Sequence, residues 1–205
     1  MKYTTIYNDP WRRAKITEPW VCWNDGFSNE ELKKIVDYCD AQGTEMGVTF
    51  GANEKKEVEE HRVSKVKFHH RNEDTAWVFD RMNFIIQSLN ESFYGFDLNG
   101  YSAFQYTTYK EEENGRYDWH MDMNLGSQYD SDAEPRKLSL TLLLNDEFEG
   151  GEFQINLGKQ ETPVTLPAEK GRVLCFPSFI LHRVAPITKG VRKSLVIWVT
   201  GPKFV

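Results

Sequence analysis

The feature that most constrains the fold is a succession of short strand-like runs after Gly100. The runs are "YSAFQYTTY", "RYDWHMD", "KLSLTLLLN", "GEFQINL", "TPVTLPA", "GRVLCFPSF", "LHRVAPIT" and "VRKSLVIWVT". Gly, Pro, Asn or Asp separates most of them. Short strands with such turn residues are typical of an antiparallel sandwich or jelly roll, whereas a parallel sheet needs crossover helices. We therefore expect a mainly β core over residues 100–201.

The first hundred residues show a different, helical pattern. The segment 28–43 opens with Ser28 and has Glu31 three residues later, which is a capping box. A second apolar stripe at helical spacing covers 72–93, with Asn72 as its expected cap. Residues 61–70 alternate like a strand outside the β core. We expect residues 1–99 to form a helical buttress and the whole chain, 1–205, to be a single domain.

Composition excludes several classes of protein. A net charge of −6 argues against a nucleic-acid-binding protein, because such proteins usually present a basic face. Three unpaired cysteines in unlike contexts argue against a disulfide framework and favour reduced thiols in the cytoplasm. The first residues lack a signal-peptide core, and no apolar run is long enough to span a membrane.

His120 and Asp122 are the first candidate metal ligands. Residues i and i+2 of a strand point to the same side, about 6.5 to 7 Å apart. An imidazole and a carboxylate on one face could therefore bind one ion, with Trp119 and Met121 packed on the other face. A single HxD pattern is common in proteins without a metal, so a third ligand is required.

His182 is the best candidate for the third ligand. In a rolled double sheet, strands far apart in the sequence become neighbours, so His182 can approach the pair. Two histidines and one carboxylate form the facial triad that suits non-haem Fe(II) and leaves three coordination sites open. His69 and His70 compete for this role, but we interpret them as structural because their strand is expected outside the β core.

Arg192 follows His182 by ten residues. Alternation places Arg192, Ser194, Val196 and Trp198 on one face of the last strand. If that face turns inward, a buried guanidinium requires an anion, and a dicarboxylate that also chelates the metal would satisfy it. The alternative is a surface arginine in the turn "KGVRKS".

The spacing of these residues resembles the 2-oxoglutarate- and Fe(II)-dependent oxygenases, in particular the prolyl 4-hydroxylase-like branch. The resemblance rests on the H-x-D motif, the distant histidine and the arginine in "VRKS". It also includes "YTTYKEEENGRYDWHMD", "RKLSLTLLLNDEFEGGEFQI" and "GRVLCFPSFILHRVAPITKGVRKSLVIWV". These stretches cover most of residues 104–199 and imply a double-stranded β-helix, the cupin-like jelly roll.

The resemblance implies a role for each candidate residue. His120, Asp122 and His182 are the expected iron ligands. Arg192, helped by Ser194, is expected to bind the distal carboxylate of 2-oxoglutarate. Tyr109 is expected to donate a further hydrogen bond to that carboxylate, with Tyr106 as the alternative. Trp198 is expected to form a wall of the pocket. Leu142 and Leu143 stand where some relatives carry tyrosines.

The expected activity is hydroxylation of an aliphatic C–H bond, coupled to conversion of 2-oxoglutarate into succinate and CO2. Ascorbate is a further cofactor that the resemblance suggests. A peptidyl residue such as proline is the first choice of substrate; a free amino acid or another small molecule is the alternative. Residues 43–60 and 123–136 are candidate lids.

Two other functions remain open. The first is a cupin-type metalloenzyme that does not use 2-oxoglutarate, in which Arg192 would have no carboxylate to bind. A non-catalytic binding module would make the three candidate ligands a coincidence.

Overall fold

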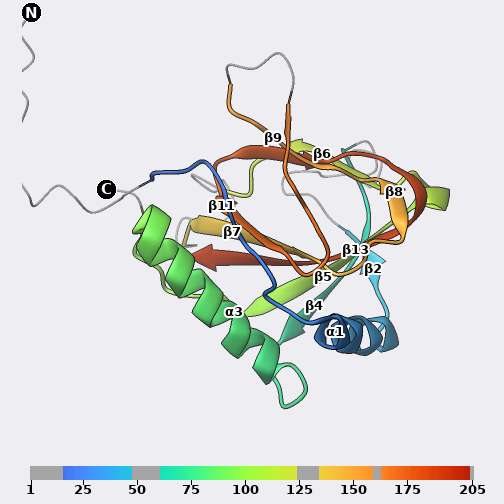
Figure 1. Ribbon diagram of the computed structural model, residues 1–205, viewed down its shortest axis with the longest axis horizontal. Helices are drawn as coiled ribbons and strands as arrows, with labels where there is room; N and C mark the ends of the chain where they lie inside the picture. Colours follow the sequence, from blue (N-terminus) through green and yellow to red (C-terminus); the bar gives the residue numbers. More distant parts are fainter. Residues whose placement is uncertain (1–15, 48–60, 124–133, 159–162, 204–205) are drawn as a thin grey trace, which may run out of the picture.

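The computed structural model describes residues 16–47, 61–123, 134–158 and 163–203. Two antiparallel sheets form a jelly roll (Figure 1). The larger sheet has the order β1 (Val21–Trp23), β11 (Val173–Pro177), β7 (Arg136–Leu143), β13 (Ile187–Thr200), β5 (Ala103–Lys110), β4 (Lys65–His70) and β2 (Glu45–Met46), with β8 (Phe148–Gly150) paired to β13. The smaller sheet has the order β10 (Val164–Thr165), β9 (Phe153–Asn156), β12 (Leu181–Val184), β6 (Arg116–His120) and β3 (Arg62–Val63). The expected jelly-roll fold is confirmed.

The long strand β13 shows why the larger sheet has two unlike faces. Leu195, Ile197 and Val199 are buried in one hydrophobic cluster. The intervening residues Arg192, Ser194, Val196 and Trp198 line a pocket on the opposite face. Because side chains alternate along a strand, β13 contributes to the core and to the pocket at the same time.

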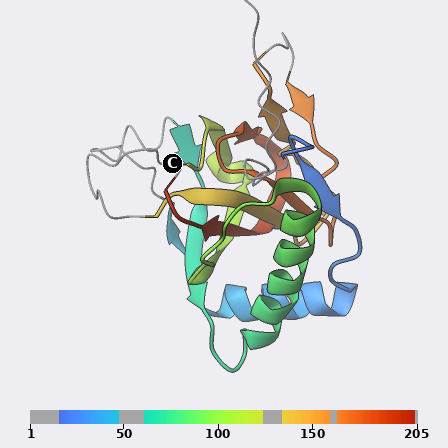
Figure 2. The ribbon, with the colours of Figure 1, turned by 90° about the vertical axis from the view of Figure 1, so that its left-hand side faces the viewer.

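Two helices cover the outer face of the larger sheet, opposite the smaller sheet (Figures 1 and 2). They are α1 (Asn29–Ala41) and α3 (Ala76–Leu89). A π-helical turn, η2 (Asn90–Tyr94), continues α3, and a 3-10 turn, η3 (Glu111–Glu113), follows β5. Among the described residues, no helix is long and apolar enough to cross a membrane.

The start of α1 matches the expectation and the start of α3 does not. Ser28 and Glu31 form both hydrogen bonds of the capping box. The second helix begins at Ala76, four residues after the expected Asn72 cap. The Asn72 side-chain oxygen instead accepts hydrogen bonds from the backbone N–H groups of Asp74 and Thr75. Asn72 therefore stabilises the turn before the helix.

The segment 61–70 was expected outside the β core, and this expectation is wrong. Its first part, β3, pairs with β6 in the smaller sheet. Its second part, β4, pairs with β5 in the larger sheet along six residues. The chain thus passes from one sheet to the other at Ser64. Alternation alone identified a strand but could not show which sheet each half would join.

Candidate metal and cosubstrate site

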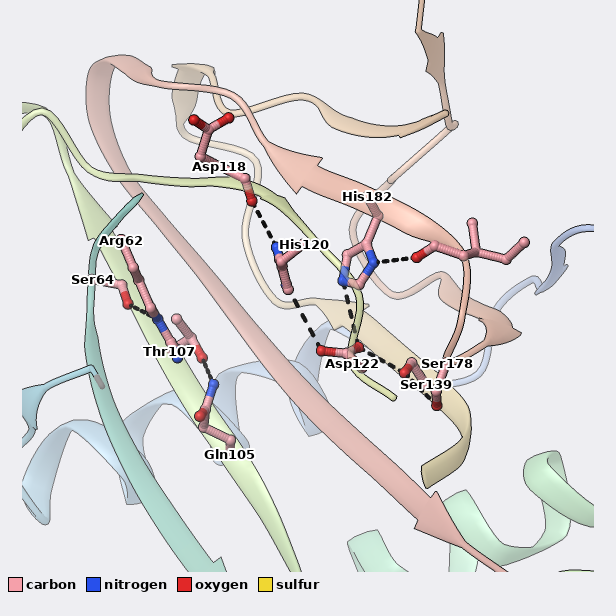
Figure 3. A network of polar contacts seen from close by, with 11 residues as sticks. Arg62, Ser64, Gln105, Thr107, Asp118, His120, Asp122, Ser139, Ser178 and His182 are labelled. Carbon is pink, nitrogen blue, oxygen red and sulfur yellow. Dashed lines mark hydrogen bonds and ion pairs between the residues drawn. The ribbon is translucent and has the colours of Figure 1, made fainter. Parts of the chain in front are cut away.

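The neighbouring strands β6 and β12 bring two of the candidate ligands together. His182 is the direct cross-strand partner of His120. Asp122 follows two residues after His120, beyond the end of β6, and its backbone N–H donates to the Ser178 carbonyl. The three side chains point toward one another from the smaller sheet and from the segment that follows β6 (Figure 3).

Each histidine is oriented by a backbone carbonyl. The Nδ1 atom of His120 lies 2.7 Å from the Asp118 carbonyl oxygen, and that of His182 lies 2.8 Å from the Ile180 oxygen. A carbonyl only accepts hydrogen bonds, so each Nδ1 must carry the hydrogen. The Nε2 atom is then the ring nitrogen that can offer a lone pair to a metal. This arrangement is the usual outer-shell support of metal-binding histidines.

The carboxylate of Asp122 is oriented by two serines. Ser139 Oγ donates to Asp122 Oδ2 at 2.7 Å and lies 2.9 Å from Ser178 Oγ. Ser139 and Ser178 are both buried. Sequence reasoning missed them, although Ser139 and Thr141 alternate with three leucines in β7 and this polar alternation was a usable signal.

The geometry fits one metal ion. His120 Nε2 lies 3.8 Å from Asp122 Oδ1, and His182 Nε2 lies 3.4 Å from Asp122 Oδ2. All three potential ligand atoms fall within 4.8 Å of one another. Adjacent ligands of an octahedral ion at about 2.1 Å would be about 3 Å apart, so small side-chain rotations suffice.

The protonation of the site also suits a metal. Burial, reinforced by the neighbouring His182, lowers the pKa of His120 to about 3. His120 is therefore neutral near pH 7. Burial opposes ionisation of Asp122, but His182, His120 and the Ser139 hydrogen bond together hold the pKa of this carboxyl below its usual value. A neutral imidazole and an ionised carboxylate are the forms that bind metal.

A bulge changes which residues of β6 face inward. Two steps along β12, from His182 to Val184, match three steps along β6, from His120 to Tyr117. Tyr117 and His120 consequently both line the pocket. Met121, expected to be packed on the back of the strand, is 56% exposed, so this expectation is wrong. Trp119 lies beneath the guanidinium of Arg183.

Arg192 lies in the same pocket as the three candidate ligands. It is 1% exposed, so the surface-arginine alternative is wrong. Its Nη1 donates to Ser194 Oγ at 3.1 Å, whereas Nε and Nη2 make no hydrogen bond with any described residue. Burial lowers the pKa of Arg192. An unpaired buried guanidinium is costly, and a carboxylate that accepts from both free nitrogens would remove this cost.

The structure distinguishes between the two candidate tyrosines. Tyr109 is the cross-strand partner of Arg192, and the guanidinium carbon lies 5.7 Å from the centre of its ring. Tyr106 lies in the cluster on the opposite face and donates to Asp40. Tyr109 therefore lines the pocket and Tyr106 does not. Trp198 also lines the pocket, and its Nε1 has no hydrogen-bond partner among the described residues.

Two further arginines near the site were not anticipated. Arg62, from β3, lines the pocket and is buried. Arg136 stacks over the Trp198 ring at 4.1 Å. No motif identifies either residue, because only the folded sheets bring them close. Most of the candidate lids, 48–60 and 124–133, lie outside the described residues.

Residues 104–200 match the family model described as "2OG-Fe(II) oxygenase superfamily". Two curated relatives are PKHD-type hydroxylases. The one from Synechococcus sp. (strain CC9311) is 38% identical over 92 residues, covering 44% of this chain and 39% of the relative. The one from Xylella fastidiosa (strain M23) is 42% identical over 95 residues, covering 43% and 40%. The chain thus spans about two fifths of the length of these relatives.

Two solved structures share the fold. A Pseudomonas putida prolyl-4-hydroxylase has a TM-score of 0.68 at 18% identity and covers 90% of this chain and 94% of its own. A Trichoplax adhaerens prolyl hydroxylase, in complex with a hypoxia inducible factor peptide fragment, has a TM-score of 0.72 at 16% identity, covering 90% and 84%. At such identities the likeness establishes the fold.

Proposed function

We propose that the protein is an Fe(II)- and 2-oxoglutarate-dependent dioxygenase, because residues 104–200 match the model of the 2OG-Fe(II) oxygenase superfamily. One observation carries the proposal. Three convergent ligand atoms lie in one pocket with a buried guanidinium, two nitrogens of which make no hydrogen bond with a described residue. A facial triad suits Fe(II), and the guanidinium suits a dicarboxylate.

When bound, Fe(II) and 2-oxoglutarate supply the oxidation: O2 places one oxygen atom in succinate and the other in the hydroxylated substrate, with loss of CO2. His120, Asp122 and His182 hold the metal. Arg192 binds the distal carboxylate, and Ser194 keeps the guanidinium in place. Tyr109 is a further donor close to Arg192, and Trp198 forms a wall of the pocket.

Part of the pocket wall is apolar. Phe153 and Phe176 pack against the His182 ring at centroid distances of 5.5 Å and 4.8 Å. Leu140, Val184 and Val196 complete the apolar lining. A dry wall strengthens the electrostatic interactions inside the site and limits side reactions.

A peptidyl residue such as proline is the proposed substrate. The support comes from the names of the relatives, which are hydroxylases, and from a structural neighbour that was solved with a peptide. A free amino acid or another small molecule is the second candidate, because the described part of the pocket does not itself select a peptide. A cupin-type enzyme that does not use 2-oxoglutarate is disfavoured, since it would leave Arg192 unpaired.

A substrate panel tests the proposed function. The protein is supplied with Fe(II), 2-oxoglutarate and O2 together with proline-containing peptides or free amino acids. We expect succinate release, and a mass increase of one oxygen atom in one class of substrate. The variant Asp122→Ala should abolish both signals. Equal succinate release by Asp122→Ala would contradict the proposed site.

Three other expectations stay predictions. Ascorbate as a cofactor rests on the family resemblance alone. The cytoplasmic location rests on the sequence. The single-domain organisation is supported by the pairing of strands from both halves of the chain within each of the two sheets.

A further inference from the structure

Three side chains that line the pocket, His120, Tyr117 and Arg62, are joined by successive stacking contacts. The Tyr117 ring lies 3.5 Å from the His120 ring, centroid to centroid, with an interplanar angle of 12°. The guanidinium carbon of Arg62 lies 4.6 Å from the centre of the same Tyr117 ring. Arg62 is 5% exposed, so the guanidinium end of the stack is buried.

The backbone places these residues in register. Arg62 and Tyr117 are direct cross-strand partners in β3 and β6. The bulge in β6 then brings Tyr117 to the same face as His120. The Nε atom of Arg62 donates to Ser64 Oγ at 2.8 Å, which fixes the plane of the guanidinium (Figure 3). A planar guanidinium stacks well on an aromatic face.

We propose that Arg62 is a positioning residue that acts through the Tyr117 ring to hold the His120 imidazole in its metal-binding orientation. The proposal rests on the proposed function, in which His120 binds the metal. The hydrogen bond from Nδ1 to the Asp118 carbonyl fixes one edge of the imidazole. The Tyr117 ring restricts the remaining tilt of the imidazole plane, and Arg62 prevents the Tyr117 ring from moving away.

This role extends the site beyond the part of the chain that matches the family. The family match begins at residue 104, whereas Arg62 lies in the N-terminal half. The short strand β3 thus contributes one side chain, Arg62, to the pocket that holds the candidate metal ligands. Both of its residues pair with β6.

Positioning by Arg62 strengthens metal binding, whereas the positive charge of Arg62 acts against it. A cation near a metal ion weakens binding by repulsion, so removing the charge alone would strengthen it. The two effects are separable. Arg62→Lys keeps the charge but loses the planar stack, whereas Arg62→Met loses both. Positioning predicts weaker binding in both variants, and repulsion predicts tighter binding in Arg62→Met only.

The test is the dissociation constant for Mn(II), a redox-stable stand-in for Fe(II), measured by the electron paramagnetic resonance signal of the free ion. We expect Arg62→Lys and Arg62→Met to bind Mn(II) about tenfold more weakly than the wild type does. This is the lower end of the loss of affinity that follows when a residue supporting a metal ligand is replaced. Tyr117→Phe keeps the aromatic ring and should bind Mn(II) as the wild type does. Tyr117→Leu loses the ring and should bind Mn(II) more weakly. Arg81→Lys is the matched control, because Arg81 stacks over Phe27 at 5.5 Å, in a contact outside the pocket.

A second variant disturbs Arg62 without replacing it, in case the Arg62 variants do not fold. A Cβ at Gly47 would lie 2.8 Å from Arg62 Nε and 2.8 Å from Ser64 Oγ, so it would disturb the hydrogen bond between these two side chains. Gly47→Ala should weaken Mn(II) binding. Gly26→Ala is its control, because a Cβ there makes only ordinary contacts, the nearest at 3.4 Å.

The outcomes distinguish the positioning role of Arg62 from the proposed function of the protein. Unchanged Mn(II) binding in Gly47→Ala and in folded Arg62 variants would overturn the positioning role and leave the proposed function intact. Tighter binding by Arg62→Met with unchanged binding by Arg62→Lys would also overturn it. A wild-type protein that binds no Mn(II) would contradict the proposed function itself, and the positioning role with it.

Discussion

The buried guanidinium of Arg192 has opposite effects on the stability of the protein and on the proposed ligand binding. Two of its nitrogens are buried and make no hydrogen bond with any residue that the structure describes. Replacing such a group with an apolar side chain of similar length is often neutral or stabilising. The same replacement removes the proposed carboxylate site.

Arg192→Met should therefore stabilise the ligand-free protein by about 1 kcal/mol and weaken 2-oxoglutarate binding by at least about thirtyfold, or roughly 2 kcal/mol. Urea unfolding measures the stability, and isothermal titration with Mn(II)-loaded protein measures the binding. Arg71→Met, which breaks an exposed ion pair with Asp80, is the control. Unchanged 2-oxoglutarate affinity in Arg192→Met would rule out the assigned role.

Ser139 gives a second prediction for a single residue. Ser139→Ala removes the donor to Asp122 Oδ2, so the carboxylate is less well oriented. We expect Mn(II) affinity to fall about tenfold. Ser88→Ala should leave affinity unchanged, because the Ser88 hydroxyl only contacts a carbonyl of its own helix. Equal Mn(II) affinities for the two variants would mean that Ser139 does not support the site.

The sequence identifies some site residues better than others. Arg192 is predictable because its strand alternates regularly and the structure keeps that alternation. Tyr117 is not, because a bulge breaks the alternation of β6. Arg62 is not, because its strand is two residues long and its partner strand is far along the chain.

Among the elements, the contact between α1 and the larger sheet contains a buried histidine. His69, on β4, lies between Tyr38 of α1 and Phe104 of β5, with ring centroids 5.5 Å and 5.2 Å away. Its Nε2 has no hydrogen-bond partner among the described residues. Burial, reinforced by Lys67, lowers the pKa of His69. The structure thus supports the structural interpretation of this residue.

The lowered pKa of His69 predicts an acid sensitivity. As pH falls below about 6.5, the unfolded chain binds a proton at His69 and the folded protein does not, so stability falls. His69→Phe should reduce the loss of unfolding free energy between pH 7.5 and pH 5.5, measured by urea unfolding. His70→Phe, an exposed neighbour, should retain the wild-type loss. Identical pH dependence in all three proteins would contradict this account.

At the level of elements, α1 and most strands are predictable because their patterns are local. The eight predicted strands correspond to β5, β6, β7, β9, β10, β11, β12 and β13. The short strands β1, β2 and β8 were missed, because two or three residues give no periodic signal. Their pairing with distant strands decides their conformation.

For the whole molecule, the N-terminal half is part of the same core as the jelly roll. The large hydrophobic cluster joins β-strand residues with nine from the two helices, namely Leu32, Ile35, Cys39, Val78, Phe79, Met82, Ile85, Ile86 and Leu89. Burying one large apolar side chain contributes about 2 kcal/mol. The loss of all nine would exceed the total stability of a typical domain, about 5 to 15 kcal/mol.

A fragment of residues 100–205 should therefore not fold alone, even though it contains the family match. We expect no cooperative thermal transition by circular dichroism, while the full chain unfolds in one transition. A fragment that unfolds cooperatively would show that the jelly roll folds independently of the two helices.

The central claim, a metal and 2-oxoglutarate bound together in one pocket, is tested most directly by thermal unfolding with each ligand alone and with both. Because a ligand that binds only the folded state raises the melting temperature, we expect a modest rise with Mn(II) and a much larger rise with Mn(II) and 2-oxoglutarate together. His182→Ala should lose the joint effect. A rise with 2-oxoglutarate that is the same with or without Mn(II), or no rise at all, would contradict the account.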